Sequence, residues 1–292
     1  MNRRNFLHTG LGATAALAFS QSSLAAFASR TSLAAMKESA AFLNVPLGFQ
    51  SWSVKDRLGK DFPGTLKTMS DMGYQLVELC SPAGYKDAGF GFLTTMKTAD
   101  IRKTIEDAGL HCPSCHFGFS ELKDHTDDSI QFAKEMGMSQ MVCSSFGVQK
   151  TATIGDWQAA CDKLNKAAEK IHSAGMQTGY HNHEGEFATL DGQLIYDVLM
   201  ARLDASMVRM QFQTEVINLG YKASTYFTKY PGRFISSHLS DWTADKKEMP
   251  IGQGVIDWKE YFNAAKTGGV KNFFVEMEFD KFKDSAPYIK SL

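Results

Sequence analysis

Two histidines and two glutamates lie within nine residues in the stretch GYHNHEGEF, Gly179 to Phe187. Imidazole and carboxylate groups together suit Mn, Co, Zn or Fe(II), and a histidine near its ordinary pKa of about 6.5 is a competent base at neutral pH. Because alternate side chains of an extended chain share a face, His181 and His183 point the same way. The stretch is therefore either a metal site at the end of a strand or a polar loop that is rich in histidine.

Short β-rich runs alternate with helical patterns from residue 45 onward. Several of the β-rich runs are almost continuously apolar, as strands buried on both faces should be. The eight predicted strands are 47–52, 75–80, 110–117, 140–146, 176–183, 207–214, 233–241 and 271–278, and the clearest predicted helix is 156–174. Five glycines each follow a helical pattern and precede a β-rich run, where a helix C-terminal glycine belongs: Gly73, Gly109, Gly137, Gly175 and Gly269.

The number and spacing of these units favour an α/β fold, a (β/α)8 TIM barrel over residues 45–292. Eight strands in the roughly 264 residues that follow an N-terminal segment give about 33 residues per unit, against roughly 31 in a typical TIM barrel. A doubly wound open sheet is the alternative, but it usually has fewer strands, and no glycine fingerprint for a dinucleotide follows any strand. No second domain is expected. The Gly-rich loop 81–95 would lie over the C-terminal mouth of the barrel as a lid.

Polar residues gather at the predicted C-terminal ends of the strands, where TIM barrels carry their catalytic groups. The alternative is that each one is a hydrogen-bonded residue of the barrel rim. Trp52 ends the first strand and could stack on a pyranose face, while Glu78, Glu184 and Asp241 are further candidates for substrate binding. The whole set is Trp52, Glu78, His116, His181, His183, Glu184, Gln211, Gln213, His238, Asp241, Glu276 and Glu278.

Residues 1–28 have the pattern of an export signal. Arg3 and Arg4 precede a short apolar run without acidic residues, and small residues stand at Ala26 and Ala28. The paired arginines resemble a Tat signal, which exports folded proteins; an amphipathic N-terminal helix is the alternative. We therefore expect a periplasmic protein in which residues 29–44 form an N-terminal extension.

The composition excludes some partners. Without Arg3 and Arg4 the chain has 29 basic against 32 acidic residues, so nucleic acid is not expected to bind. No apolar run after the signal is long enough to span a membrane, and a homodimer is compatible with the chain. Five cysteines argue against a full disulfide framework, although Cys112 and Cys115 have the CxxC spacing of a redox pair.

Four segments resemble the xylose-isomerase-like TIM-barrel family, which is described broadly as sugar phosphate isomerases and epimerases. They are YHNH, YPGRF, GxGxIDW and FVEME, and the resemblance covers roughly residues 45 to 290. That family typically binds one divalent metal through Glu, Asp, His and Glu. The resemblance places the family histidine at His238 and the last glutamate at Glu276. It places the first glutamate at His181 and the aspartate at Gln213.

Two of these positions depart from the family pattern. With His181 and Gln213 the set carries one formal negative charge, where the family carries three. Neutral ligands hold a hard dication more weakly, so the site would favour Mn, Co, Zn or Fe, and a metal-free site stays an alternative.

The resemblance implies removal of a proton beside a carbonyl, with the metal stabilising the enediolate. Glu276 would be one acid–base group, and His181, His183 or His116 the opposite one. Export favours free sugars or keto-glycosides over phosphorylated substrates. We therefore expect an exported sugar isomerase or epimerase. A 3-keto-glycoside lyase or hydratase that starts from the same proton abstraction, and a non-catalytic sugar-binding barrel, are the alternatives; a metal-dependent endonuclease is a weaker one.

Overall fold

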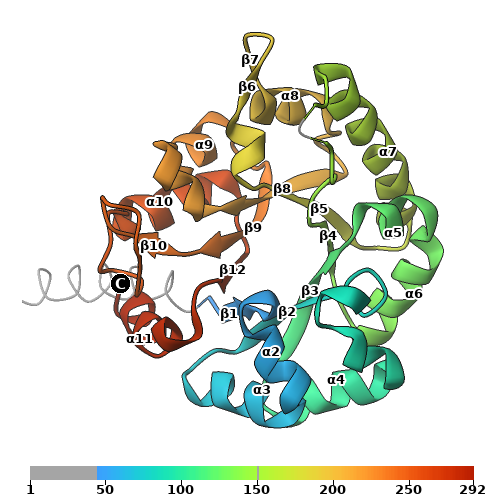
Figure 1. Ribbon diagram of the computed structural model, residues 1–292, viewed down its shortest axis with the longest axis vertical. Coiled ribbons are helices and arrows are strands. Elements are labelled where there is room, and N and C mark those ends of the chain that lie inside the picture. Colours follow the sequence, from blue (N-terminus) through green and yellow to red (C-terminus); the bar gives the residue numbers. More distant parts are fainter. Residues whose placement is uncertain (1–44, 150) are drawn as a thin grey trace, which may run out of the picture. The chain divides into compact units, whose positions relative to one another are not determined.

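Eight parallel strands close into a barrel in the computed structural model, which describes residues 45–149 and 151–292 (Figure 1). Strands that follow one another along the chain lie side by side in the barrel. The strands are β1 (Leu47–Gln50), β2 (Leu76–Cys80), β3 (His111–Phe117), β4 (Gln140–Cys143), β5 (Gln177–His181), β8 (Val208–Gln213), β9 (Phe234–Leu239) and β12 (Asn272–Val275). The predicted (β/α)8 barrel is confirmed. The predicted signal 1–28 and extension 29–44 lie outside the described residues.

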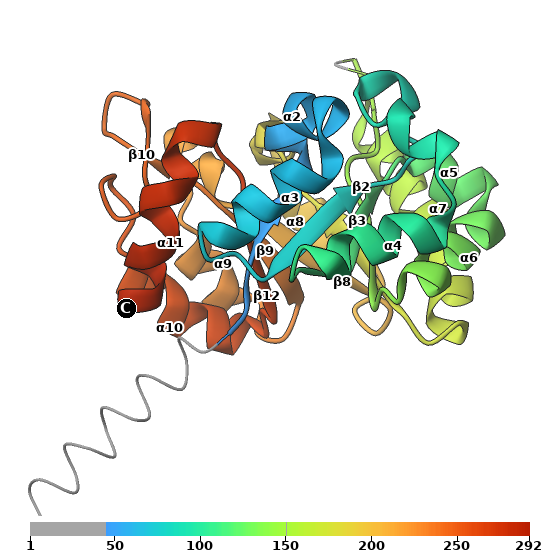
Figure 2. The ribbon, with the colours of Figure 1, turned by 90° about the horizontal axis from the view of Figure 1, so that it is seen from below.

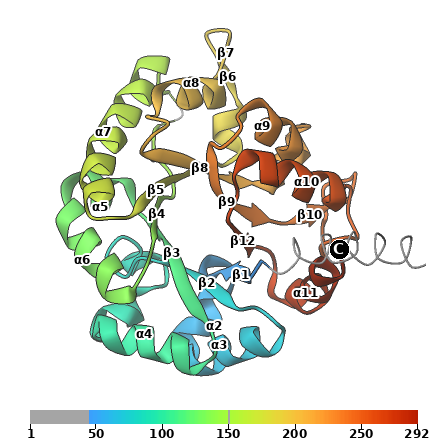
Figure 3. The same ribbon diagram turned by 180° about the vertical axis from the view of Figure 1, so that it is seen from behind.

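Helices surround the barrel on its outer side, as the views from both ends show (Figures 1 and 3). They are α3 (Phe62–Asp71), α4 (Thr98–Asp107), α6 (Thr126–Met136), α7 (Ile154–Ser173), α8 (Ile195–Arg202), α9 (Ala223–Lys229), α10 (Trp258–Gly268) and α11 (Phe282–Ser291). The helix predicted at 156–174 is α7. It begins two residues earlier because Thr153 and Asp156 cap each other: Asp156 N donates to Thr153 Oγ1 at 3.2 Å, and Thr153 N donates to Asp156 Oδ2 at 2.8 Å.

The five glycines predicted to end helices all adopt positive φ, between 75° and 98°. A residue with a side chain rarely adopts this left-handed conformation, so glycine stops the helix and turns the chain toward the next strand. This local rule, repeated along the chain, sets the spacing of the βα units.

Glycines inside the barrel make room for larger neighbours at its N-terminal half. A Cβ added to Gly48 would lie 2.4 Å from Cδ1 of Phe274, and one added to Gly179 would lie 2.9 Å from Cγ2 of Val142. The interior at this level is therefore filled by apolar side chains. The next inward positions, two residues further along the strands, are polar, and they form the layer in which the candidate site lies.

Several strands end earlier than their apolar runs predict. The run 140–146 ends as a strand at Cys143, and the run 271–278 ends at Val275. Glu276 therefore follows β12, and the alternation predicted for Glu276 and Glu278 is lost. Glu278 is exposed, and its backbone N–H donates to Glu248 Oε2 at 2.7 Å.

Shorter elements gather at the end of the barrel toward which the arrow of β2 points (Figure 2). They include α2 (Lys55–Lys60), α5 (Phe119–Asp124) and the two-stranded ribbon of β10 (Asp241–Trp242) and β11 (Glu248–Met249). Within the predicted lid, residues 81–95, Phe90 and Leu93 are buried. These two side chains anchor the segment in the position that the structure describes. That the segment moves as a lid stays a prediction.

The cysteines do not form disulfide bonds in this structure. All five cysteines are free and buried. Burial raises the pKa of Cys112 to about 12 and that of Cys115 well above its usual range, so both thiols stay protonated and apolar.

No helix in residues 45–149 and 151–292 is long and apolar enough to cross a membrane.

Candidate active site

The strand register brings the predicted polar residues into one layer inside the barrel. In register, Glu78 pairs with Gln50 on one side and with Ser114 on the other, and Gln213 pairs with His238. Paired positions of neighbouring strands point to the same side of the sheet, so these side chains meet in the barrel interior.

Glu78 lies at the bottom of this layer with no exposed surface. Its carboxylate accepts hydrogen bonds from Gln50 Nε2 at 2.7 Å, Ser114 Oγ at 2.5 Å, Gln211 Nε2 at 2.8 Å and His238 Nε2 at 2.6 Å. Burial alone would raise the pKa of Glu78. The charges of His116 and His238 and the hydrogen bonds from His238 and Ser114 outweigh it and lower the pKa to about 2. Glu78 was predicted to bind substrate. In the structure it is an ionised group that contacts His238 and His116.

His238 bridges two carboxylates. Its Nε2 lies 2.6 Å from Glu78 Oε2, and its Nδ1 lies 2.8 Å from Glu276 Oε2. Burial would lower the pKa of His238, but the two carboxylates outweigh it and raise the pKa to about 9. Because carboxylates only accept, both ring nitrogens carry protons. A metal ion can therefore bind His238 only in place of one of these protons.

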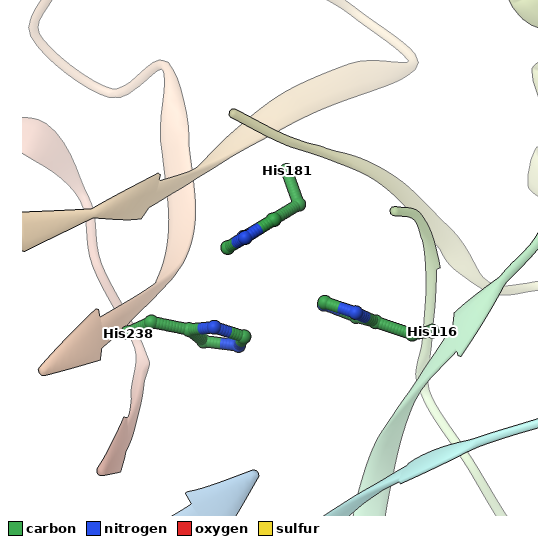
Figure 4. A group of neighbouring side chains, drawn as sticks. All are labelled: His116, His181 and His238. Atoms are coloured by element: carbon green, nitrogen blue, oxygen red, sulfur yellow. The ribbon is translucent and has the colours of Figure 1, made fainter. Parts of the chain in front are cut away.

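Three imidazoles converge above Glu78. The ligand atoms of His116, His181 and His238 all lie within 4.8 Å of one another, and their rings extend from β3, β5 and β9 toward a common space (Figure 4). Burial is the main cause that lowers the pKa of His116 and, more strongly, that of His181. His181 Nδ1 is buried without a hydrogen-bond partner. A buried imidazole nitrogen without a partner, as in His181, fits a divalent metal that prefers nitrogen ligands.

Glu276 and Gln213 lie beside these imidazoles. Gln213 Nε2 donates to Glu276 Oε2 at 2.7 Å, while Gln213 Oε1 is buried without a partner. Burial would raise the pKa of Glu276, but the charge and hydrogen bond of His238 outweigh it and lower the pKa. The Glu276 side chain is 19 % exposed, whereas that of His238 is fully buried. The predicted metal set His181, Gln213, His238 and Glu276 is thus assembled in one place, together with His116.

A cavity of about 230 Å³ opens beside this cluster. It is lined by Trp52, Cys80, Tyr85, His116, Ser144, Ser145, His181, His183 and Glu276. Trp52 is 40 % exposed, and Lys55 Nζ lies 3.3 Å from its ring centroid. A sugar could stack on the ring face that Lys55 covers only after this ammonium group moves away.

Two predicted substrate-binding residues do not line this cavity. Glu184 is an exposed residue of the 3-10 helix Glu184–Phe187. Asp241 is fully buried, and its carboxylate accepts hydrogen bonds from Gly252 N at 2.9 Å, Gly254 N at 3.1 Å and Trp258 Nε1 at 2.8 Å. Asp241 therefore holds the loop 252–258 against the barrel. This role explains the second glycine of the GxGxIDW segment. A Cβ on Gly254 would lie 2.1 Å from Asp241 Oδ1, too close for any other residue.

Replacing Asp241 by Ala is expected to lower the free energy of unfolding by about 3 kcal/mol, because buried N–H donors lose a charged acceptor. Asp245, an exposed residue that pairs with Lys247, is the matched control, and Asp245→Ala is expected to cost no more than about 0.5 kcal/mol. Urea unfolding of the three proteins measures the difference. Equal stability of the two variants would show that Asp241 does not hold the loop.

Several residues of the site were not predicted from the sequence. Gln50 and Ser114 contact Glu78 directly, while Tyr85 and Ser144 line the cavity. Residues two apart on a strand share a face, so Gln50 points into the barrel as Gly48 does, and this alternation could have identified it. No comparable signal marks Tyr85, which reaches the cavity from the loop 81–95.

The chain is similar to a known enzyme and to proteins of known structure. It is 22 % identical over 240 residues to the inosose dehydratase of Geobacillus thermodenitrificans (strain NG80-2), covering 69 % of this chain and 80 % of that protein. A sugar phosphate isomerase/epimerase from Parabacteroides distasonis ATCC 8503 superposes with a TM-score of 0.74 at 23 % identity, covering 85 % and 94 % of the two chains. A xylose isomerase-like TIM barrel protein from Mycobacterium smegmatis, solved in complex with magnesium, superposes with a TM-score of 0.63 at 13 % identity, covering 85 % and 96 %.

The model of one protein family matches most of the chain, from residue 66 to residue 292, and its description is xylose isomerase-like TIM barrel. The matched segment contains seven of the eight barrel strands and every histidine of the cluster. The chain belongs to the xylose isomerase-like TIM-barrel family.

Proposed function

We propose that the protein is an exported sugar isomerase or epimerase that removes a proton beside the carbonyl of a sugar or keto-sugar with the help of a divalent metal. The observation that carries this proposal is the ionised Glu276 at the cavity wall, beside three convergent imidazoles. Relatives that are isomerases, epimerases and dehydratases support an enzyme of the isomerase or lyase type. Export is supported by the Arg3–Arg4 pair and the apolar run that follows it.

The cavity lining favours an unphosphorylated substrate. None of the described residues that line it is a lysine or an arginine, and Glu276 adds a negative charge. A phosphate group inside the cavity would therefore find no lysine or arginine among the lining side chains; Lys55, over the ring of Trp52, lies outside that lining. The volume of about 230 Å³ is smaller than the roughly 300–1,000 Å³ of pockets for drug-sized ligands, which suits a single sugar ring.

Glu276 is the proposed base. Its Oε2 accepts hydrogen bonds from both Gln213 and His238, which leaves Oε1 to take a proton from the substrate carbon. His183 lines the same cavity and is exposed, so it can return a proton to the substrate. His116, His181 and His238 would hold a divalent ion, which when bound supplies Lewis acidity at a carbonyl oxygen.

A lyase or hydratase that acts on keto-glycosides is the second candidate. The similarity to an inosose dehydratase favours it, since loss of a leaving group can follow the same proton abstraction. The two candidates differ in the fate of the carbanion, and product analysis separates them. A sugar-binding barrel without catalysis is the third possibility and is an outcome of the experiment below.

Metal content and proton exchange test the proposal. The protein made through its own export route is expected to hold about one equivalent of Mn, Co, Zn or Fe. His238→Ala should lose the metal, whereas His172→Ala, an exposed histidine of α7, should keep it. With keto-sugars in deuterated water, the wild-type protein should exchange the carbon-bound proton. No metal and no exchange after reconstitution would overturn the proposal and leave a sugar-binding barrel.

A further inference from the structure

One buried amide connects Glu78 to the imidazoles. Gln211 of β8 has no exposed surface. Its Nε2 donates to Glu78 Oε1 at 2.8 Å and to Ser236 Oγ at 2.9 Å, and its Oε1 lies 2.6 Å from His116 Nε2. The carboxylate of Glu78 can only accept, so the NH2 end of the amide must face Glu78 and the oxygen must face the histidine.

This orientation determines which nitrogen of His116 carries the proton. His116 Nε2 faces two acceptors, Gln211 Oε1 at 2.6 Å and Glu78 Oε2 at 3.3 Å, so it carries hydrogen. Neither acceptor faces the other ring nitrogen, so Nδ1 of His116 is the nitrogen left for a ligand.

His181 lies beside His116, with their ring centroids 4.9 Å apart. Its Nδ1 is buried without a hydrogen-bond partner, so this nitrogen is also left for a ligand.

We propose that Gln211 is a positioning residue whose amide oxygen holds the Nε2–H of His116, so that Nδ1 of His116, like the unpartnered Nδ1 of His181, is left to bind a cation or a substrate hydroxyl group. The anchoring of the amide by Glu78 prevents it from flipping, because a flipped amide would direct its oxygen at the carboxylate. Neighbours that orient a metal-binding histidine commonly change affinity or activity by about 10–100-fold when they are replaced. The kinetic consequence rests on the proposed function, whereas the tautomer of His116 does not.

The tautomer of His116 is measurable without activity. Long-range 1H–15N NMR of the metal-free, full-length protein with 15N-labelled histidine, at pH 8, should show His116 as the Nε2–H tautomer. Gln211→Met removes the nearer of the two acceptors at similar volume and leaves only Glu78 Oε2 at 3.3 Å, so a larger share of His116 should adopt the Nδ1–H form. Ser236→Ala removes one anchor but keeps the bond to Glu78, so it should leave the tautomer of His116 unchanged. An Nδ1–H tautomer at His116 in the wild-type protein would overturn the inference, even if Gln211→Met does not fold.

A kinetic measurement separates positioning from packing. For a folded Gln211→Met, kcat on a keto-sugar substrate should fall by about 10–100-fold with little change in KM, while Ser236→Ala stays near wild type. A full kcat in Gln211→Met would contradict the positioning role. If the wild-type protein turns over no keto-sugar, the proposed function fails, and the NMR result still decides the tautomer of His116.

Discussion

Glu276→Gln is expected to lower kcat/KM for proton exchange by about 10²–10⁴-fold, the usual contribution of a general base. The amide is nearly the same size as the carboxylate, and its oxygen can still accept from His238 or Gln213, so the barrel should stay folded. The variant lacks the negative charge and the basic lone pair that would take the proton. Deuterium incorporation at the substrate carbon, followed by NMR, measures the effect.

Glu278→Gln is the matched control for this experiment. Glu278 stands two residues away and is exposed, and it contacts Lys281 instead of the histidines. It should keep wild-type exchange. Wild-type turnover in Glu276→Gln would remove Glu276 from the chemistry and move the role of base to one of the histidines.

Glu78→Ala is expected to have the largest effect on stability, a loss of about 3–5 kcal/mol, as when one partner of a buried ion pair is removed. The substitution leaves the N–H or O–H groups of Gln50, Ser114 and Gln211 without an acceptor, and it leaves His238 with a single carboxylate. Urea unfolding of the metal-free protein measures the loss. Glu169→Ala, at an exposed position of α7, should change stability by no more than about 0.5 kcal/mol.

Acid should reduce the difference between wild type and Glu78→Ala. The pKa of Glu78 is about 2 in the folded protein and near its usual 4.5 in the unfolded chain. Its contribution to stability is therefore present above pH 4.5 and is lost as the pH falls toward 2. A difference that stays constant over this range would show that the charge of Glu78 does not stabilise the fold.

The local chemistry of the sequence was sufficient to predict the barrel. Apolar runs identified all eight strands, and the glycines that end helices, such as Gly137 and Gly269, have the positive φ that this position requires. The sequence also placed His181 and His238 at the C-terminal ends of their strands, and in the structure both stand there and belong to the histidine cluster. These rules act over a few residues, so they can be read from the sequence.

The tertiary structure alone decided what the acidic residues do. Glu78 and Asp241 both stand at strand ends and were assigned the same role from the sequence. The register of three strands places Glu78 under the histidines, whereas the path of the loop 252–258 surrounds Asp241 with N–H donors. Likewise, the amide of Gln211 is oriented by Glu78, which lies 133 positions away along the chain. Contacts of this range depend on how the barrel closes, which no local pattern of the sequence encodes.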